Sequence, residues 1–124
     1  DFSIMYDRSH FSLSFLSFLS PIMVVQVNEA QLTSLLQSSG LVVIDFFATW
    51  CGPCKMMTPK FEKLTVDFPN VKFAKVDIDE EEAVASRYTI NLMPTFVFFR
   101  DGKEIHRVEG TKEDDLRSHI SLLQ

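Results

Sequence analysis

Apolar runs alternate with amphipathic stretches along this chain, and the pattern predicts strands and helices in turn. Residues 41–47, LVVIDFF, are almost all β-branched or aromatic, which is typical of a strand buried on both faces of a sheet. Asp101-Gly102 separates two later apolar runs and predicts a tight hairpin between antiparallel strands. The predicted strands are residues 23–27, 41–47, 71–78, 94–100 and 103–110.

Four stretches with helical spacing lie between or after these strands. Asn28, with Gln31 three residues later, is typical of a helix N-cap with a capping box. A long helix is predicted after the cysteines, because apolar residues recur there every three to four positions. Asp79 is predicted to cap a short third helix, and Thr111 is predicted to open the last one.

The resulting order, βαβαβαββα, predicts an α/β domain. Crossover helices between parallel strands place helices on both faces of the sheet, so we expect a mixed five-stranded sheet flanked by four helices. The chain has 124 residues, which is enough for one domain and too short for two of typical size. We assign this domain to residues 23–124.

Residues 1–22 differ in composition from the rest, being rich in Ser, Phe and Leu without a clear periodicity. We favour upstream sequence, introduced by cloning or by an alternative start before Met23, over a targeting segment. The apolar stretch 11–19 is interleaved with Ser, and no small-residue cleavage site follows it. It is also shorter than the roughly 20 apolar residues of a membrane span, so we expect no membrane partner.

Composition and charge narrow the class of partner. Hydrophobic residues make up 46% of the chain and charged residues 23%, which indicates a packed interior and not a disordered chain. Acidic residues outnumber basic ones by 17 to 12, and no basic cluster longer than a pair is present. We therefore expect no nucleic acid partner.

The chain's two cysteines lie in the stretch TWCGPCK, residues 49–55. Two thiols at this spacing can serve as a structural disulfide, a metal site or a redox pair. The loop between them is so short that linking them restricts the unfolded chain very little. Zinc normally takes four Cys or His ligands, and only His10, His106 and His119 accompany the pair, at no recognisable spacing. We therefore assign no metal, and keep metal binding as a minor alternative.

The position of the pair favours redox chemistry. Cys51 is predicted where a buried strand ends and a helix begins, a place where functional groups gather in α/β sheets. Unpaired backbone N–H groups at the helix start stabilise a thiolate there. Pro53 suits the first helical turn, and Gly52 permits close approach of a partner. Cys54 lies further into the helix and is expected to be more buried, so Cys51 attacks first and Cys54 resolves.

The stretches VVIDFFATWCGPCK (residues 42–55) and MPTFVFF (residues 93–99) resemble the thioredoxin family, and the resemblance extends from about Met23 to the end. It implies a thioredoxin fold and a thiol-disulfide oxidoreductase that reduces protein disulfides through Cys51 and Cys54. No bound cofactor is implied, only a redox-active Cys51–Cys54 disulfide.

The resemblance also implies partners and a cellular role. Electrons come from NADPH through thioredoxin reductase, and clients are disulfide-containing proteins such as peroxiredoxins. The implied role is electron transport in cell redox homeostasis, by a monomer in the cytoplasm. A mitochondrial or secreted location is the alternative if residues 1–22 are a targeting segment.

Asp45 is the candidate for moving the proton of Cys54. It interrupts an apolar run six residues before Cys51, where desolvation raises the pKa of a carboxyl group. From burial alone, a structural acid is the better interpretation. The resemblance reverses this, because the aspartate at this position in thioredoxins assists proton transfer, with the lysine at the Lys75 position modulating it.

The remaining site residues follow from the resemblance. It implies that Gly52 and Pro53 tune the redox potential, and that substrate peptides bind along Trp50, Met93, Pro94 and Gly110, with Pro94 in the cis form. A disulfide oxidase or isomerase is an alternative. Pro53 argues against it, because it adds no positive charge to stabilise the reduced form. A binding module in which the thiols are incidental has no separate signature.

Overall fold

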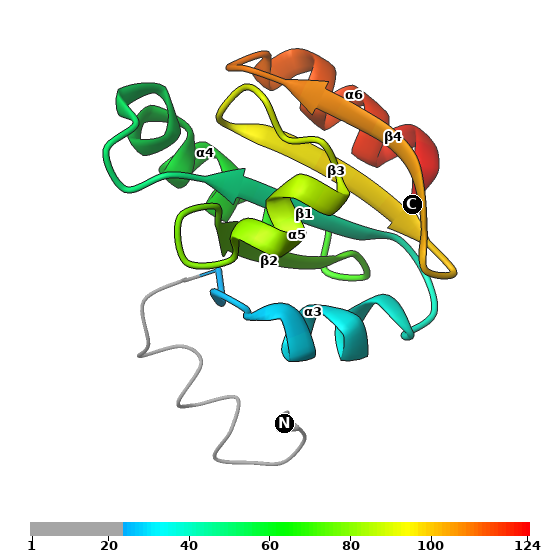
Figure 1. The fold of residues 1–124 in the computed structure, drawn as a ribbon. Helices are drawn as coiled ribbons and strands as arrows, with labels where there is room; N and C mark the ends of the chain where they lie inside the picture. The colour runs from blue at the N-terminus through cyan, green and yellow to red at the C-terminus, as the bar shows by residue number, and fades with distance from the viewer. Residues whose placement is uncertain (1–23) are drawn as a thin grey trace, which may run out of the picture.

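The computed structural model describes residues 24–124, so the predicted extension, residues 1–22, lies outside the described part. It contains four helices and four strands (Figure 1). In chain order they are α3 (Glu29–Leu36), β1 (Val42–Phe47), α4 (Gly52–Asp67), β2 (Lys72–Asp77), α5 (Glu82–Arg87), β3 (Thr95–Arg100), β4 (Lys103–Glu109) and α6 (Glu113–Leu123).

The strands form one mixed sheet in the order β2-β1-β3-β4. Strand β1 runs parallel to β2, with Asp45 opposite Lys75, and antiparallel to β3. Strands β3 and β4 are antiparallel, and their register shifts between Phe98 and Phe99. The predicted α/β architecture is therefore confirmed, with β1 in the centre.

The number of strands in the prediction was wrong by one. Residues 23–27 were expected to form a strand, but among the described residues only Gln26 pairs, in an isolated parallel bridge with Lys75. Two backbone hydrogen bonds flank it, from Val27 N to Lys75 O at 2.9 Å and from Lys75 N to Val25 O at 3.0 Å. The run ends there because Asn28 already caps the next helix.

Two helices cover each face of the sheet (Figure 1). Helices α4 and α6 pack on one face, where their apolar residues share a core with Val43 of β1. Helices α3 and α5 pack on the other face, with Ile44 and Phe46. Side chains alternate between faces along a strand. Asp45, two residues after Val43, therefore points toward the face covered by α4.

The predicted hairpin is confirmed. Asp101 and Gly102 have φ values of 54° and 79°, and two consecutive residues with positive φ make the turn that matches the twist of the flanking strands. The capping box is confirmed too: Gln31 N donates to Asn28 Oδ1, and Asn28 N donates to Gln31 Oε1, both at 2.9 Å.

Two other predicted caps were wrong. Helix α5 has Glu81 at its N-cap instead of Asp79, and α6 has Lys112 instead of Thr111; neither cap residue makes a side-chain cap hydrogen bond. Acidic side chains in the first turn favour each helix start through the helix dipole instead. Within residues 24–124, no helix combines the length and apolarity needed to cross a bilayer.

Candidate active site

The two cysteines lie at the start of α4, directly after the loop that leaves β1. Cys51 is the N-cap residue, and its Sγ accepts a hydrogen bond from Cys54 N at 3.1 Å. The two residues form a disulfide with their Cα atoms 5.3 Å apart. Exposed Gly52 and Pro53 complete the first turn, with the proline where its missing N–H costs no hydrogen bond.

Both sulfur-bearing side chains are shielded, Cys54 more than Cys51. Cys51 is 6% exposed and Cys54 is 3% exposed, in the order that their positions on the helix predict. Sγ of Cys51 lies 3.7 Å from the carbonyl oxygen of Met93, in the loop before β3. The loop before β3 therefore lies directly against the disulfide.

The loop before β3 closes against the end of β4. The Met93-Pro94 peptide bond is cis, as the resemblance implies. The carbonyl oxygen of Pro94 accepts a hydrogen bond from Gly110 N at 2.8 Å, and Gly110 has a φ of 89°, which favours glycine. Met93 thus lies beside Cys51, and Gly110 is joined to this loop through Pro94.

Trp50 lies on the surface next to the disulfide. Its side chain is 65% exposed, and its Nε1 donates to Asp79 Oδ2 at 2.9 Å. The sequence prediction placed Asp79 at a helix cap, so this contact was missed. No local pattern signals it, because the two residues are 29 positions apart and meet only through the fold.

Asp45 and Lys75 lie close to Cys54 in the interior. A cavity of 280 Å³ is lined by Asp45, Cys54, Thr58 and Lys75, among others. This volume is large enough for several water molecules, at roughly 30 Å³ each. It provides space for a water-mediated path between the carboxyl group of Asp45 and the sulfur of Cys54.

The environment of Asp45 favours its neutral form. The side chain is 4% exposed, and Oδ1 has no hydrogen-bond partner among residues 24–124. Burial raises the pKa of Asp45 from 3.8 to about 7, although the charge of Lys75 opposes the shift. Lys75 Nζ also lies 5.3 Å from the centre of the Phe47 ring. Asp45 can therefore gain or lose a proton near neutral pH.

This arrangement supplies what thiol-disulfide exchange requires. A cysteine pair at a helix start can alternate between dithiol and disulfide, and a nearby group that titrates near pH 7 can exchange the proton involved. The two sulfurs are themselves the redox group, so the chemistry needs no bound cofactor. Fold and site together define a thiol-disulfide oxidoreductase.

Comparisons with known proteins agree with this class. Residues 23–122 match the family model described as Thioredoxin. Thioredoxin H1 from Arabidopsis thaliana is 46% identical over 97 residues, which cover 78% of this chain and 85% of that protein. The structure of Fasciola hepatica thioredoxin matches with a TM-score of 0.77 and 45% identity, over 82% of this chain and 100% of that one.

A further match comes from a structure described as the thiol resolving mechanism in yeast mitochondrial 1-Cys peroxiredoxin via glutathione/thioredoxin systems. It has a TM-score of 0.76 and 38% identity, over 81% of this chain and 95% of that one.

The present chain belongs to the thioredoxin family. It is a protein-disulfide reductase whose redox group is the Cys51–Cys54 disulfide.

Proposed function

We propose a division of roles in which Cys51 is the nucleophile and Cys54 the resolving thiol. The Cys51 thiolate attacks a client disulfide, a Cys51–client disulfide forms, and the second client sulfur leaves as a thiolate. The Cys54 thiolate then attacks the Cys51 sulfur and releases the reduced client. The enzyme's dithiol is oxidised by two electrons and the client disulfide is reduced by two.

The observation that carries this proposal is the position of Cys51 at the N-cap of α4. Its sulfur accepts the Cys54 N–H at 3.1 Å, and this hydrogen bond stabilises negative charge on Cys51. Cys51 is also the more exposed of the two side chains. In this proposal Gly52 and Pro53 tune the redox potential by shaping the turn between the sulfurs.

Asp45 accepts the proton that Cys54 loses when it attacks. Support comes from its pKa of about 7 and from the cavity that it shares with Cys54 and Lys75. Its carboxylate form is available near neutral pH, which suits a general base. Lys75 favours that form through its positive charge and so modulates the proton transfer.

Clients dock as extended peptides beside Cys51. The backbone of Met93, next to the cis Pro94, offers hydrogen-bonding groups for short β-type pairing. Gly110 adjoins this docking segment through its hydrogen bond to Pro94, and the exposed indole of Trp50, next to Cys51 in the chain, offers an apolar surface for the client.

The supply of electrons and the clients complete the proposal. An NADPH-dependent thioredoxin reductase re-reduces the Cys51–Cys54 disulfide, and clients include peroxiredoxins. The peroxiredoxin named for the yeast structure supports this client class. The enzyme acts as a monomer in the cytoplasm, in electron transport for redox homeostasis. Both H-type thioredoxins and a mitochondrial thioredoxin are among its matches, so a mitochondrial location is the alternative.

A coupled assay tests the roles of the two cysteines. The chain is supplied with NADPH and thioredoxin reductase, and NADPH consumption is followed with a disulfide-bonded client protein. Cys51→Ser is expected to abolish turnover, because it removes the attacking thiolate and leaves only the more buried Cys54. Cys54→Ser is expected to stop after the first exchange and to accumulate a Cys51–client disulfide, visible on a non-reducing gel and by intact mass.

Met56→Ala is a suitable control for the cysteine substitutions. Met56 is exposed on α4, the helix that carries Cys54, and has no part in the proposed chemistry. It is expected to keep wild-type turnover. Full turnover by Cys51→Ser would overturn the nucleophile assignment. Absence of a mixed disulfide with Cys54→Ser, from a client that the wild type reduces, would overturn the resolving role.

A further inference from the structure

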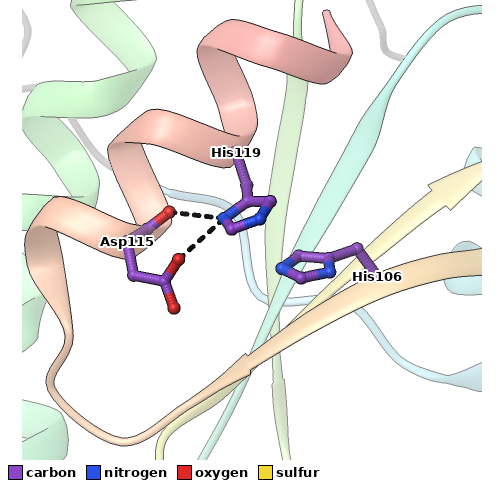
Figure 2. A group of neighbouring side chains, drawn as sticks. All are labelled: His106, Asp115 and His119. Carbon is purple, nitrogen blue, oxygen red and sulfur yellow. Dashed lines mark hydrogen bonds and ion pairs between the residues drawn. The ribbon is translucent and has the colours of Figure 1, made fainter.

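A second group of titratable side chains lies between β4 and α6 and shares no residue with the active site. It consists of His106 on β4 and of Asp115 and His119 on α6. Asp115 and His119 are four residues apart, so their side chains lie on one face of the helix. Figure 2 shows this pair facing the His106 ring, which reaches toward it from the strand.

The two imidazole rings are held close together. They stack with centroids 3.8 Å apart and planes inclined by 21°. The ring of Phe98, on the neighbouring strand, meets both of them edge to face, at 5.3 Å from His106 and 6.5 Å from His119. This aromatic packing keeps the two imidazole rings next to each other.

Among residues 24–124, one buried ring nitrogen of the group has no hydrogen-bond partner. Nδ1 of His119 lies 2.7 Å from Asp115 Oδ1 and 2.9 Å from the Asp115 carbonyl oxygen (Figure 2). By contrast, Nε2 of His106 is buried and has no hydrogen-bond partner among residues 24–124. A buried polar atom without a partner is costly, and a bound cation would satisfy it.

We propose that His106, Asp115 and His119 bind a divalent first-row transition metal ion of the zinc class. Two imidazole nitrogens and one carboxylate oxygen suit Zn²⁺, whereas Ca²⁺ and Mg²⁺ prefer oxygen ligands alone. One ligand atom from each of the three residues lies within 4.8 Å of the others. Solvent completes the coordination.

Binding the ion requires the stacked rings to turn relative to each other, because an imidazole binds a metal within its ring plane and the two planes are nearly parallel. In a tetrahedral zinc site the donor atoms are about 3.4 Å apart, which follows from metal–nitrogen distances of about 2.05 Å. The present spacing of up to 4.8 Å closes by rotation of side chains. His119 and Asp115 are 32% and 43% exposed, so they have room to move and the ion can enter from solvent.

Titration calorimetry with ZnCl₂ tests the site. The full-length chain is used without an affinity tag and in the oxidised form, because reduced Cys51 and Cys54 would bind zinc themselves. A His10→Gln background removes the only other histidine of the chain. We expect one ion per chain, and at least a tenfold loss of affinity with Asp115→Asn or His119→Gln.

Asp114→Asn is the matched control for Asp115→Asn. It removes the same charge from the neighbouring position of α6, where the side chain is exposed and outside the group. We expect it to change the affinity by less than twofold. Equal losses of affinity from Asp114→Asn and Asp115→Asn would mean that zinc is attracted only by the general negative charge of α6, and would overturn the proposal. Absence of zinc binding to the His10→Gln protein would also overturn it.

A spectroscopic readout separates metal binding from an effect of substitution on folding. In ¹⁵N-detected histidine spectra of the otherwise unsubstituted His10→Gln protein, zinc is expected to shift the ring nitrogens of both His106 and His119. Unchanged ring-nitrogen signals of His106 and His119 in the presence of zinc would overturn the assignment even if calorimetry showed binding.

Discussion

At the scale of single residues, Asp45 connects the chemistry of the site with the stability of the fold. Burial raises its pKa from 3.8 to about 7, so between these pH values the folded chain binds a proton at Asp45 more tightly than the unfolded chain does. Stability therefore falls as the pH rises through this window, because the folded state must bury an ionised carboxylate. The carboxylate proposed for proton transfer thus destabilises the folded protein at neutral pH.

Asp45→Asn is expected to remove this pH dependence, because the amide stays neutral throughout. Relative to the variant, the oxidised wild type is expected to lose on the order of 3 kcal/mol of unfolding free energy between pH 5 and pH 8. Urea unfolding of both proteins at the two pH values measures the difference. With a client, the variant is also expected to slow release of the reduced product more than formation of the mixed disulfide.

Asp77 offers a matched control for the substitution. It is also 4% exposed, but its Oδ1 accepts a hydrogen bond from Asp79 N at 2.9 Å. Asp77→Asn keeps an oxygen for that bond and is expected to retain the wild-type pH dependence and both exchange rates. If Asp45→Asn showed the same pH dependence as the wild type, Asp45 would not be the group that titrates in this window.

Sequence patterns predicted some single residues and missed others for a physical reason. An acid within an apolar strand run indicated the burial and raised pKa of Asp45, because both arise from the strand itself. Its pairing with Lys75 depends on the register of two strands, and the contact of Trp50 with Asp79 depends on how two loops meet. Such contacts have no local signal, so only the family resemblance placed Lys75 near Asp45.

At the scale of elements, the contribution of the α3 capping box to the free energy of unfolding can be measured. This helix has only eight residues, so unpaired N–H groups at its start matter. Asn28→Ala removes the acceptor of the Gln31 N–H and is expected to cost about 1 kcal/mol of unfolding free energy. Chemical unfolding at pH 7 measures the loss.

Asn28→Ser tests whether the cap is responsible. Serine can accept the same hydrogen bond, so this variant is expected to recover most of the stability lost in Asn28→Ala. An equal loss in both variants would show that the side chain of Asn28 stabilises the fold in some other way.

Turns and caps that depend on a few adjacent residues were predicted correctly. Elements whose residues could join either of two neighbouring structures were not. The Asp101-Gly102 turn and the Asn28 cap depend on residues within a few positions, and both are confirmed. Residues 23–27 have a strand-like composition, yet in the described part of the chain this run pairs only around Lys75, because α3 begins at once. Asp79 looked like a cap, but its carboxylate binds Trp50 instead.

At the scale of the whole molecule, long-range packing creates both groups of functional side chains. The active site combines the start of α4 with the loop before β3 and the end of β4, and the histidine group joins β4 to α6. Asp115 and His119 have the i, i+4 spacing of a helical ligand pair, a signal that was available in the sequence. Their partner His106 joins them only through the packing of α6 on the sheet, which explains why the histidines showed no recognisable spacing.

The boundary of the domain yields the last prediction. The family match begins at residue 23, and every proposed active-site residue follows it. A chain of residues 23–124 is therefore expected to reduce client disulfides within about twofold of the full-length rate and to keep its unfolding midpoint. The coupled NADPH assay and urea unfolding measure the two quantities.

A shorter chain, residues 28–124 with an added initiating Met, provides the contrast. It lacks Val24 and Val27, which are 7% and 8% exposed, and both backbone hydrogen bonds to Lys75. Loss of the two buried valines alone is expected to cost roughly 3 kcal/mol or more. The truncation also removes the residues that pair with β2 beside Lys75, so product release is expected to slow if Lys75 modulates Asp45.

Each truncation has an outcome that would contradict this boundary. A stable and fully active 28–124 chain would move the start of the domain beyond Val27. Loss of activity in the 23–124 chain would give residues 1–22 a role in the enzyme.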